Sequence, residues 1–138
     1  MAAPFRKEIT VRSSGRGFID LSDRVNAVVR ESGLRDGLCN VFLVHTSASL
    51  VLGENADPSV RRDLEAYFAR IVPDGDPAYE HDAEGDDDMP AHIRTVLTQN
   101  SIVIPVASNA LAMGTWQGLY LWEHRKAPHE RRVIVTLW

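Results

Sequence analysis

The chain has 138 residues, of which 44% are hydrophobic and 25% are charged, and it carries a formal net charge of −4. This composition excludes a disordered, collagen-like or low-complexity chain, and the length predicts one domain over residues 1–138. Because 19 acidic residues outnumber 15 basic ones, the overall charge argues against nucleic acid and anionic membranes as partners, although a local basic pocket can still hold a small anion.

The first half of the chain alternates between strand and helix signals. Apolar and charged residues mix over Phe5–Arg12, which predicts an amphipathic strand with one wet face. Asp20 can cap a helix that ends before Gly33. The apolar run Cys39–His45 predicts a strand covered on both faces, and Leu50–Leu52 is a second apolar piece.

The next segment predicts a helix followed by a long loop. Asp57 and Pro58 are typical of a helix start, and the expected buried stripe of this helix is Val60, Leu64, Tyr67, Phe68 and Ile71. The segment Pro73–Asp88 contains prolines, glycines and a dense acidic run. We expect a loop there that is either partly mobile or able to close over a site.

The last third is rich in strands. A short helix is predicted over Pro90–Gln99, its start favoured by the acidic residues 86–88. Strands are predicted over Ser101–Val106, Gln117–Glu123 and Arg132–Trp138. Because strands outweigh helices and cluster late in the chain, we predict an α+β fold of mostly antiparallel sheets with a few packed helices.

Cysteine usage and the N-terminal segment bear on the compartment. Cys39 is the only cysteine in the sequence, which excludes an internal disulfide and predicts a small buried hydrophobe. Met1–Phe5 lack a basic region followed by a long apolar stretch, and no run of about 18 apolar residues occurs. We therefore expect a cytoplasmic protein that does not span a membrane.

His45 is the most conspicuous candidate for chemistry, because it ends a strand that should be buried. Thr46, Ser47 and Ser49 follow it. An imidazole can bind a metal or move a proton, and hydroxyls can hold phosphate oxygens. The alternative is a core histidine followed by hydroxyls that shape a turn. Both interpretations remain open.

Two further groups are candidates for the same chemistry. Glu54 and Asn55 can supply an acid, a base or cation ligands, whereas Asp57 is better explained as a helix cap. Trp116 and Gln117 lie between two glycines, which indicates either a pocket wall or a tight turn with a core tryptophan.

Four other histidines are present, and their spacing matches no metal motif such as HExxH. His81 and His92 can join His45 only by tertiary convergence. His124 and His129 flank basic residues and a proline, and we expect them in a loop or at an edge. The acidic run of residues 84–88 is most simply a hydrated loop with helix capping.

Together these motifs resemble the YjbQ family, small proteins described as secondary thiamine-phosphate synthase enzymes. The resemblance runs through most of the chain and rests on the order and spacing of His45–Ser49, Glu54–Pro58 with Asp63 and Leu64, His81, Ala91 with His92, Ile104–Val106, Gly114–Gln117, and Glu123.

The resemblance implies a sandwich or pseudobarrel that assembles as a homotrimer. It also implies that His45, His81 and His92 are the metal or catalytic set, with zinc or magnesium as the divalent ion. The implied reaction joins a pyrimidine diphosphate to a thiazole phosphate and releases pyrophosphate. Within it, Glu54 and Asn55 would orient substrate or water. The expected substrate-binding residues are Thr46, Ser47, Ser49, Arg94, Trp116, Gln117 and Arg131.

A competing hypothesis is a non-catalytic trimeric binding protein for a small phosphorylated metabolite, in which the same histidines hold an anion or stabilise the interface. The chain also departs from the family pattern. It has amides near Gln99 or Asn100 and at Asn109, where glycine is usual, and Arg125–His129 replaces an Asp-Gly-Pro turn. These departures leave the choice of substrate open.

Overall fold

The computed structural model describes residues 3–138, which form two antiparallel sheets and three helices. The strands are β1 Phe5–Arg12, β2 Gly17–Asp20, β3 Gly37–Leu43, β4 Ala48–Glu54, β5 Ser101–Ala107, β6 Ala110–Leu111, β7 Gln117–Glu123 and β8 Glu130–Leu137; the helices are α1 Ser22–Ser32, α2 Pro58–Ile71 and α3 Asp88–Leu97. The larger sheet has the order β1-β8-β3-β5-β6 and the smaller one β2-β7-β4. The predicted α+β class is confirmed.

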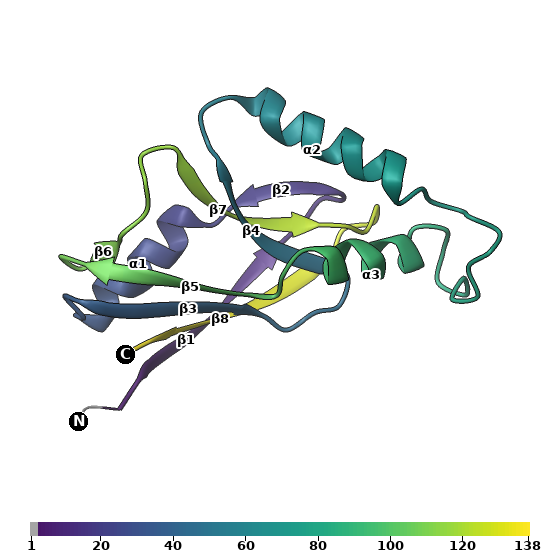
Figure 1. Cartoon of the computed structure of the whole chain (residues 1–138). Coiled ribbons are helices and arrows are strands. Elements are labelled where there is room, and N and C mark those ends of the chain that lie inside the picture. Colours follow the sequence, from purple (N-terminus) through teal and green to yellow (C-terminus); the bar gives the residue numbers. More distant parts are fainter. Residues whose placement is uncertain (1–2) are drawn as a thin grey trace.

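One cluster of buried apolar side chains draws on both sheets and on α1. Val41 and Val135 come from the larger sheet, Leu50 and Leu121 from the smaller one, and Val29 from α1. In Figure 1, α3 lies beside β4, whereas α2 stands apart above the small sheet. Within the described range, no helix has both the length and the apolarity needed to cross a membrane.

Strand β3 differs from its prediction in both position and covering. It ends at Leu43, so His45 lies in the link to β4 and not at the end of a strand. Cys39 is buried as expected, but Leu38 is 37% and Phe42 40% exposed on the opposite face. The prediction of a strand covered on both faces is therefore wrong for this chain, because no second layer lies over the outer side of the larger sheet.

Helix α2 begins and ends as predicted, but its burial differs. The Oδ1 of Asp57 accepts a hydrogen bond of 2.9 Å from the Ser59 N–H, which confirms the helix cap. None of the helix residues is buried; Tyr67 and Ile71 are exposed, and Leu64 is only half-buried. The predicted buried stripe is wrong because polar contacts hold the helix beside the small sheet without close packing.

Most of the other elements follow the sequence closely, although the short strands β2 and β6 are not among the predicted elements. Helix α3 starts two residues earlier than expected, so that Pro90 lies in its first turn, where proline is tolerated. Ser108 and Asn109 have left-handed backbones, with φ of 52° and 61°. The Asn109 side chain donates to the carbonyls of Val29 and Leu34 at the end of α1. The amide that replaces a glycine therefore adopts the same backbone region and adds two hydrogen bonds.

The two faces of the larger sheet can be compared with one matched pair of variants. Val41→Thr places a hydroxyl in the core, and we expect it to lower the free energy of unfolding by roughly 1–3 kcal/mol. Val103→Thr makes the same change on the exposed face, and the expected loss is under about 0.5 kcal/mol. Urea denaturation at low protein concentration measures both. Equal losses would show that the outer face is enclosed within one chain.

Candidate functional site

The described residues bring two histidines and one carboxylate together. The ligand atoms of His81, Asp88 and His92 all lie within 4.8 Å of one another. Asp88 and His92 are four residues apart in α3, so both side chains lie on one face of that helix. His81 comes from the preceding loop, and its ring centroid is 5.2 Å from that of His92. The sequence predicts the two histidines through the family resemblance but not Asp88.

The contacts within this cluster resemble a ligand set more than a hydrogen-bond network. The Nε2 of His81 lies 2.8 Å from the Oδ2 of Asp88, yet this oxygen has no hydrogen-bond partner. Asp88 is only 1% exposed, and an unsatisfied buried carboxylate oxygen is costly. A cation between the three side chains would satisfy it.

The tautomer of His92 supports the same interpretation. Its Nδ1 lies 2.9 Å from the carbonyl oxygen of Thr46 and must therefore donate a proton to it. In the neutral form of the ring, the Nε2 atom, 3.2 Å from the Oδ1 of Asp88, then carries the lone pair that a metal ion would use. Histidines that bind metals are commonly oriented in this way by a hydrogen bond from the other ring nitrogen.

The acidic loop is tied to the segment that follows β7. Arg125 donates to the Oδ2 of Asp87 at 3.0 Å, to the Oδ1 of Asp88 at 2.9 Å and to the Glu84 carbonyl at 2.8 Å. Asp87 makes no side-chain cap bond to α3. The prediction of a hydrated loop with helix capping is therefore wrong for Asp87 and Asp88, which are buried against a guanidinium.

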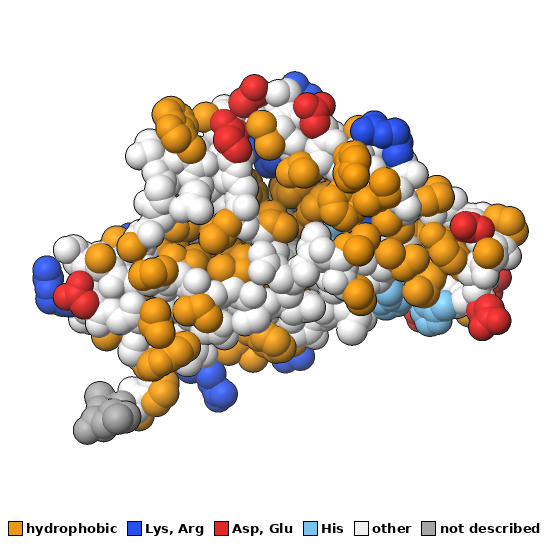
Figure 2. Space-filling model, viewed as in Figure 1, with side chains coloured by type: hydrophobic (Ala, Val, Ile, Leu, Met, Phe, Trp, Pro, Cys, Tyr) orange, Lys and Arg blue, Asp and Glu red, His pale blue; other side chains and the backbone are white. Residues whose placement is uncertain are grey.

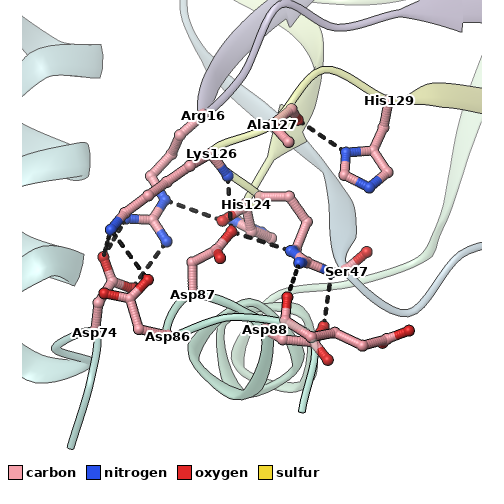
Figure 3. Close-up of polar contacts among 12 residues, drawn as sticks. Arg16, Ser47, Asp74, Asp86, Asp87, Asp88, His124, Lys126, Ala127 and His129 are labelled. Carbon is pink, nitrogen blue, oxygen red and sulfur yellow. Dashed lines mark hydrogen bonds and ion pairs between the residues drawn. The ribbon is translucent and has the colours of Figure 1, made fainter. Parts of the chain in front are cut away.

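A second set of ion pairs holds the start of this loop. Arg16 pairs with both carboxylate oxygens of Asp74, at 2.9 and 3.0 Å, and Lys126 lies 3.4 Å from Asp74 and 3.3 Å from Asp86. Figure 3 shows these two cations reaching the carboxylates from the same side. The hydrogen bonds from Arg16 outweigh the effect of burial and lower the pKa of Asp74. The structure thus shows Pro73–Asp88 anchored over the residues after β7.

His45 lies outside the cluster but close to His92. Its Nε2 accepts a 2.9 Å hydrogen bond from the Arg132 N–H, so the proton of the neutral ring is on Nδ1. Burial, and then the charges of Arg131 and Arg132, lower the pKa of His45. His45, Thr46 and His92 line one open pocket of about 540 Å³. Histidine side chains appear below α3 on the face shown in Figure 2.

Most of the predicted phosphate-binding groups are enclosed. Arg94 is fully buried and pairs with Glu65 at 2.5 Å. Arg131 is also buried and pairs with Glu123 at 2.5 Å while donating to Ser47. Neither guanidinium is accessible to a ligand in the chain as described. Among the predicted hydroxyls, Thr46 lines the pocket, whereas Ser47 and Ser49 are buried.

The remaining predicted site residues form a separate turn near the start of α2. Glu54 accepts hydrogen bonds from the Ala56 and Asp57 N–H groups. Asn55 donates to the carbonyls of Thr115 and Gln117, and Gln117 accepts from the Gly114 N–H. Trp116 is 66% exposed, so the alternative of a core tryptophan is wrong. None of these predicted site residues lines the pocket beside His45.

His124 is the histidine that the sequence assigns wrongly. It is fully buried and not at an edge, and its Nε2 lies 2.8 Å from the Ser49 hydroxyl. Burial, followed by the charges of Arg94, Arg16 and Arg131, lowers the pKa of His124 to about 3. The sequence feature that could have predicted the burial of His124 is the apolar run directly before it, since β7 is buried from Gly118 to Glu123.

Two histidines and a buried carboxylate beside an open pocket, carried by antiparallel sheets, define a small α+β protein with a candidate metal centre. The family described as UPF0047 protein YjbQ-like matches residues 7–138, and the chain belongs to this family. A UPF0047 protein of Synechocystis sp. is 49% identical over 97% of this chain and 93% of its own length. YjbQ of Escherichia coli O157:H7 is 45% identical, with 96% of each chain covered.

Solved structures agree with this assignment. A YjbQ/UPF0047 family protein from Clostridium acetobutylicum, described as uncharacterized, has a TM-score of 0.87 and 36% identity, with 96% of this chain and 99% of that chain covered. A conserved hypothetical protein from Thermus thermophilus has a TM-score of 0.86 and 31% identity, with 96% and 99% covered. These relatives establish the family and its fold without naming a reaction.

The lowered pKa of His124 predicts a pH dependence of stability. The unfolded imidazole takes up a proton near pH 6.5, whereas the folded one stays neutral, so stability is full above pH 6.5 and falls as the pH drops toward 3. The expected loss is about 2 kcal/mol between pH 7 and pH 5. His45, whose pKa is also lowered, acts in the same direction.

Urea denaturation of His124→Gln at both pH values checks this dependence. We expect the variant to be less stable at pH 7 and to lose clearly less stability on going to pH 5. His129→Gln is the control, because His129 lies outside the buried network and hydrogen-bonds the Ala127 carbonyl. If His124→Gln keeps the wild-type slope, the prediction is contradicted.

Proposed function

We propose that the chain is a metal-dependent enzyme that acts on a phosphorylated small molecule in the cytoplasm. The observation that carries this proposal is the buried Oδ2 of Asp88, which accepts no hydrogen bond from the described residues and lies beside the Nε2 atoms of His81 and His92. Two imidazoles and one carboxylate suit zinc or another first-row divalent ion better than magnesium, which prefers oxygen ligands. Such an ion would offset negative charge on phosphate oxygens.

The groups beside this cluster suit phosphate binding. The pocket continues from His92 to Thr46 and His45, and the hydroxyl of Thr46 is a hydrogen-bond donor for a phosphate oxygen. His45 is held neutral with its Nδ1 protonated, so this N–H can donate a hydrogen bond to the negative charge that develops on a leaving group. This role replaces metal binding by His45, because its Nε2 already accepts a hydrogen bond from Arg132.

The reaction implied by the family resemblance fits these groups. In it, a ring nitrogen of the thiazole phosphate forms a bond to the pyrimidine methylene carbon while the carbon–oxygen bond to the diphosphate breaks. The electron pair of that bond leaves with pyrophosphate. With Arg94 and Arg131 enclosed by carboxylates, His45 and Thr46 are the protein groups left to contact the leaving group in this pocket.

Metal binding is the first prediction of this proposal. Chelator-treated wild-type protein should bind one zinc ion per chain in a calorimetric titration. His92→Ala should weaken binding by more than about 100-fold, because loss of an outer-shell partner alone costs 10–100-fold. His129→Ala is the matched control and should bind as the wild type does. A folded wild type that binds no zinc, cobalt or manganese would rule out the metal site.

Turnover separates the enzyme from a non-catalytic binding protein. We expect zinc-loaded protein to release pyrophosphate from the pyrimidine diphosphate only when the thiazole phosphate is present. His45→Ala should slow this release at least tenfold, because removing one hydrogen-bond donor to developing negative charge costs about 10²–10³-fold. Its zinc affinity should not change. Tight binding of either phosphate without any turnover would favour the binding-protein alternative.

We also propose that the chain assembles as a homotrimer, as the family resemblance implies. Leu38, Phe42 and Val103 are exposed apolar residues on the uncovered face of the larger sheet, and such a patch favours a protein contact. Light scattering during gel filtration should give about three times the chain mass of 15.4 kDa. Phe42→Asp should lower the mass toward that of one chain, whereas a monomeric wild type would contradict the proposal.

A further inference from the structure

Helix α2 is held over the small sheet by polar contacts at two positions of its inner face. Arg61 donates to the Tyr120 hydroxyl and to the Glu54 carbonyl, each at 3.0 Å. One turn later, Glu65 accepts from Arg94 at 2.5 Å and from the Trp122 indole at 2.8 Å. These contacts fix the helix without burying any of its residues.

A cavity of about 230 Å³ lies between the helix and the sheet. Aromatic rings form much of its wall. Phe18 stacks on Trp122 with centroids 4.4 Å apart, Phe68 meets Trp122 edge-on at 4.7 Å, and Phe18 meets Tyr120 edge-on at 5.9 Å. Leu64 lines the side toward α2. The space-filling view shows a hollow among hydrophobic side chains below this helix (Figure 2).

A pair of glycines lies beside the cavity, and one of them, Gly53, lines it. Gly53 of β4 lies opposite Gly118 of β7, and a Cβ on Gly118 would come within 2.7 Å of the Tyr120 ring. The absence of side chains at this pair lets the Tyr120 ring lie flat against the strand, with its hydroxyl at Arg61. Gly53 and Tyr120 line this cavity, which is distinct from the pocket of His45.

The charge at one end of the cavity limits the kind of ligand. Arg61 has no carboxylate within ion-pair distance among residues 3–138, and its recorded hydrogen bonds use only Nη1. Glu54 also lines the cavity, but its carboxylate accepts hydrogen bonds from the backbone and makes no ion pair with Arg61 among residues 3–138. A guanidinium with free donors next to an aromatic wall suits an anionic group on a planar ring.

We propose that this cavity binds a small planar aromatic carboxylate, with the ring among Phe18, Phe68 and Trp122 and the carboxylate on Arg61. The site shares no lining residue with the pocket of His45 and His92. It therefore does not depend on the proposed metal centre. Cavities lined by apolar rings with one or two convergent polar groups are typical of small-molecule sites.

Calorimetric titration of the full chain with 2-naphthoate tests the proposal, and 2-naphthamide serves as the uncharged twin. Wild type should bind the naphthoate more tightly than the amide. Arg61→Gln should weaken naphthoate binding about tenfold more than it weakens amide binding, the size of one charge-assisted hydrogen bond. Arg61→Lys should keep part of the preference for the acid. Arg62→Gln, a change at an exposed neighbour, should have no effect.

A variant that fills the cavity provides a second test of the proposal. Leu64→Trp should abolish binding of both probes while circular dichroism and the melting transition show a folded chain. The proposal is overturned if wild type does not bind millimolar naphthoate, or if Leu64→Trp binds it normally. A mass change in Leu64→Trp without probe binding to wild type would instead assign the cavity to a second copy of the chain.

Discussion

The buried ion pair between Glu123 and Arg131 joins the two sheets at one end of the core. Glu123 ends β7 of the small sheet, and Arg131 lies in β8 of the larger one. The guanidinium donates to both carboxylate oxygens, at 2.8 and 2.5 Å. Burial opposes the charged carboxylate, but hydrogen bonds from Arg131 and Ser13 outweigh it and lower the pKa of Glu123. Removing one partner of such a pair costs about 3–5 kcal/mol.

The candidate site depends on this pair through three short connections. Glu123 also accepts from the backbone N–H groups of His124 and Arg125, which sets the segment whose Arg125 side chain holds Asp88. Arg131 donates to the carbonyl of Ser47, next to the Thr46 carbonyl that orients His92. A hydrophobic pair of similar volume would fill the core as well, but it would leave these backbone groups unsatisfied. The pair therefore positions the cluster of His81, Asp88 and His92 more than it stabilises the sheets.

Local signals in the sequence are sufficient for most elements but not for the site. Asp57 with Pro58 marks the start of α2, because capping is decided by neighbouring residues. The burial of Asp88 depends on Arg125, which is 37 residues away, and an acidic run has an adequate local explanation at a helix start. The family resemblance supplies His81 and His92, yet the enclosure of Arg94 by Glu65 depends on how two helices meet. These contacts join residues that are distant in the sequence, so the spacing of apolar residues along the chain does not predict them.

The two helices that follow β4 differ in how closely they pack against the sheets. Helix α3 buries Ala91 and Arg94 beside β4, so the face that carries Asp88 and His92 belongs to a packed element. Helix α2 leaves its apolar stripe half-exposed over a cavity and is attached mainly through Arg61 and Glu65. Elements with few buried apolar contacts open at lower free energy than the core. The fold thus carries Asp88 and His92 on a helix with buried residues, whereas α2, which has none, contributes little to the core.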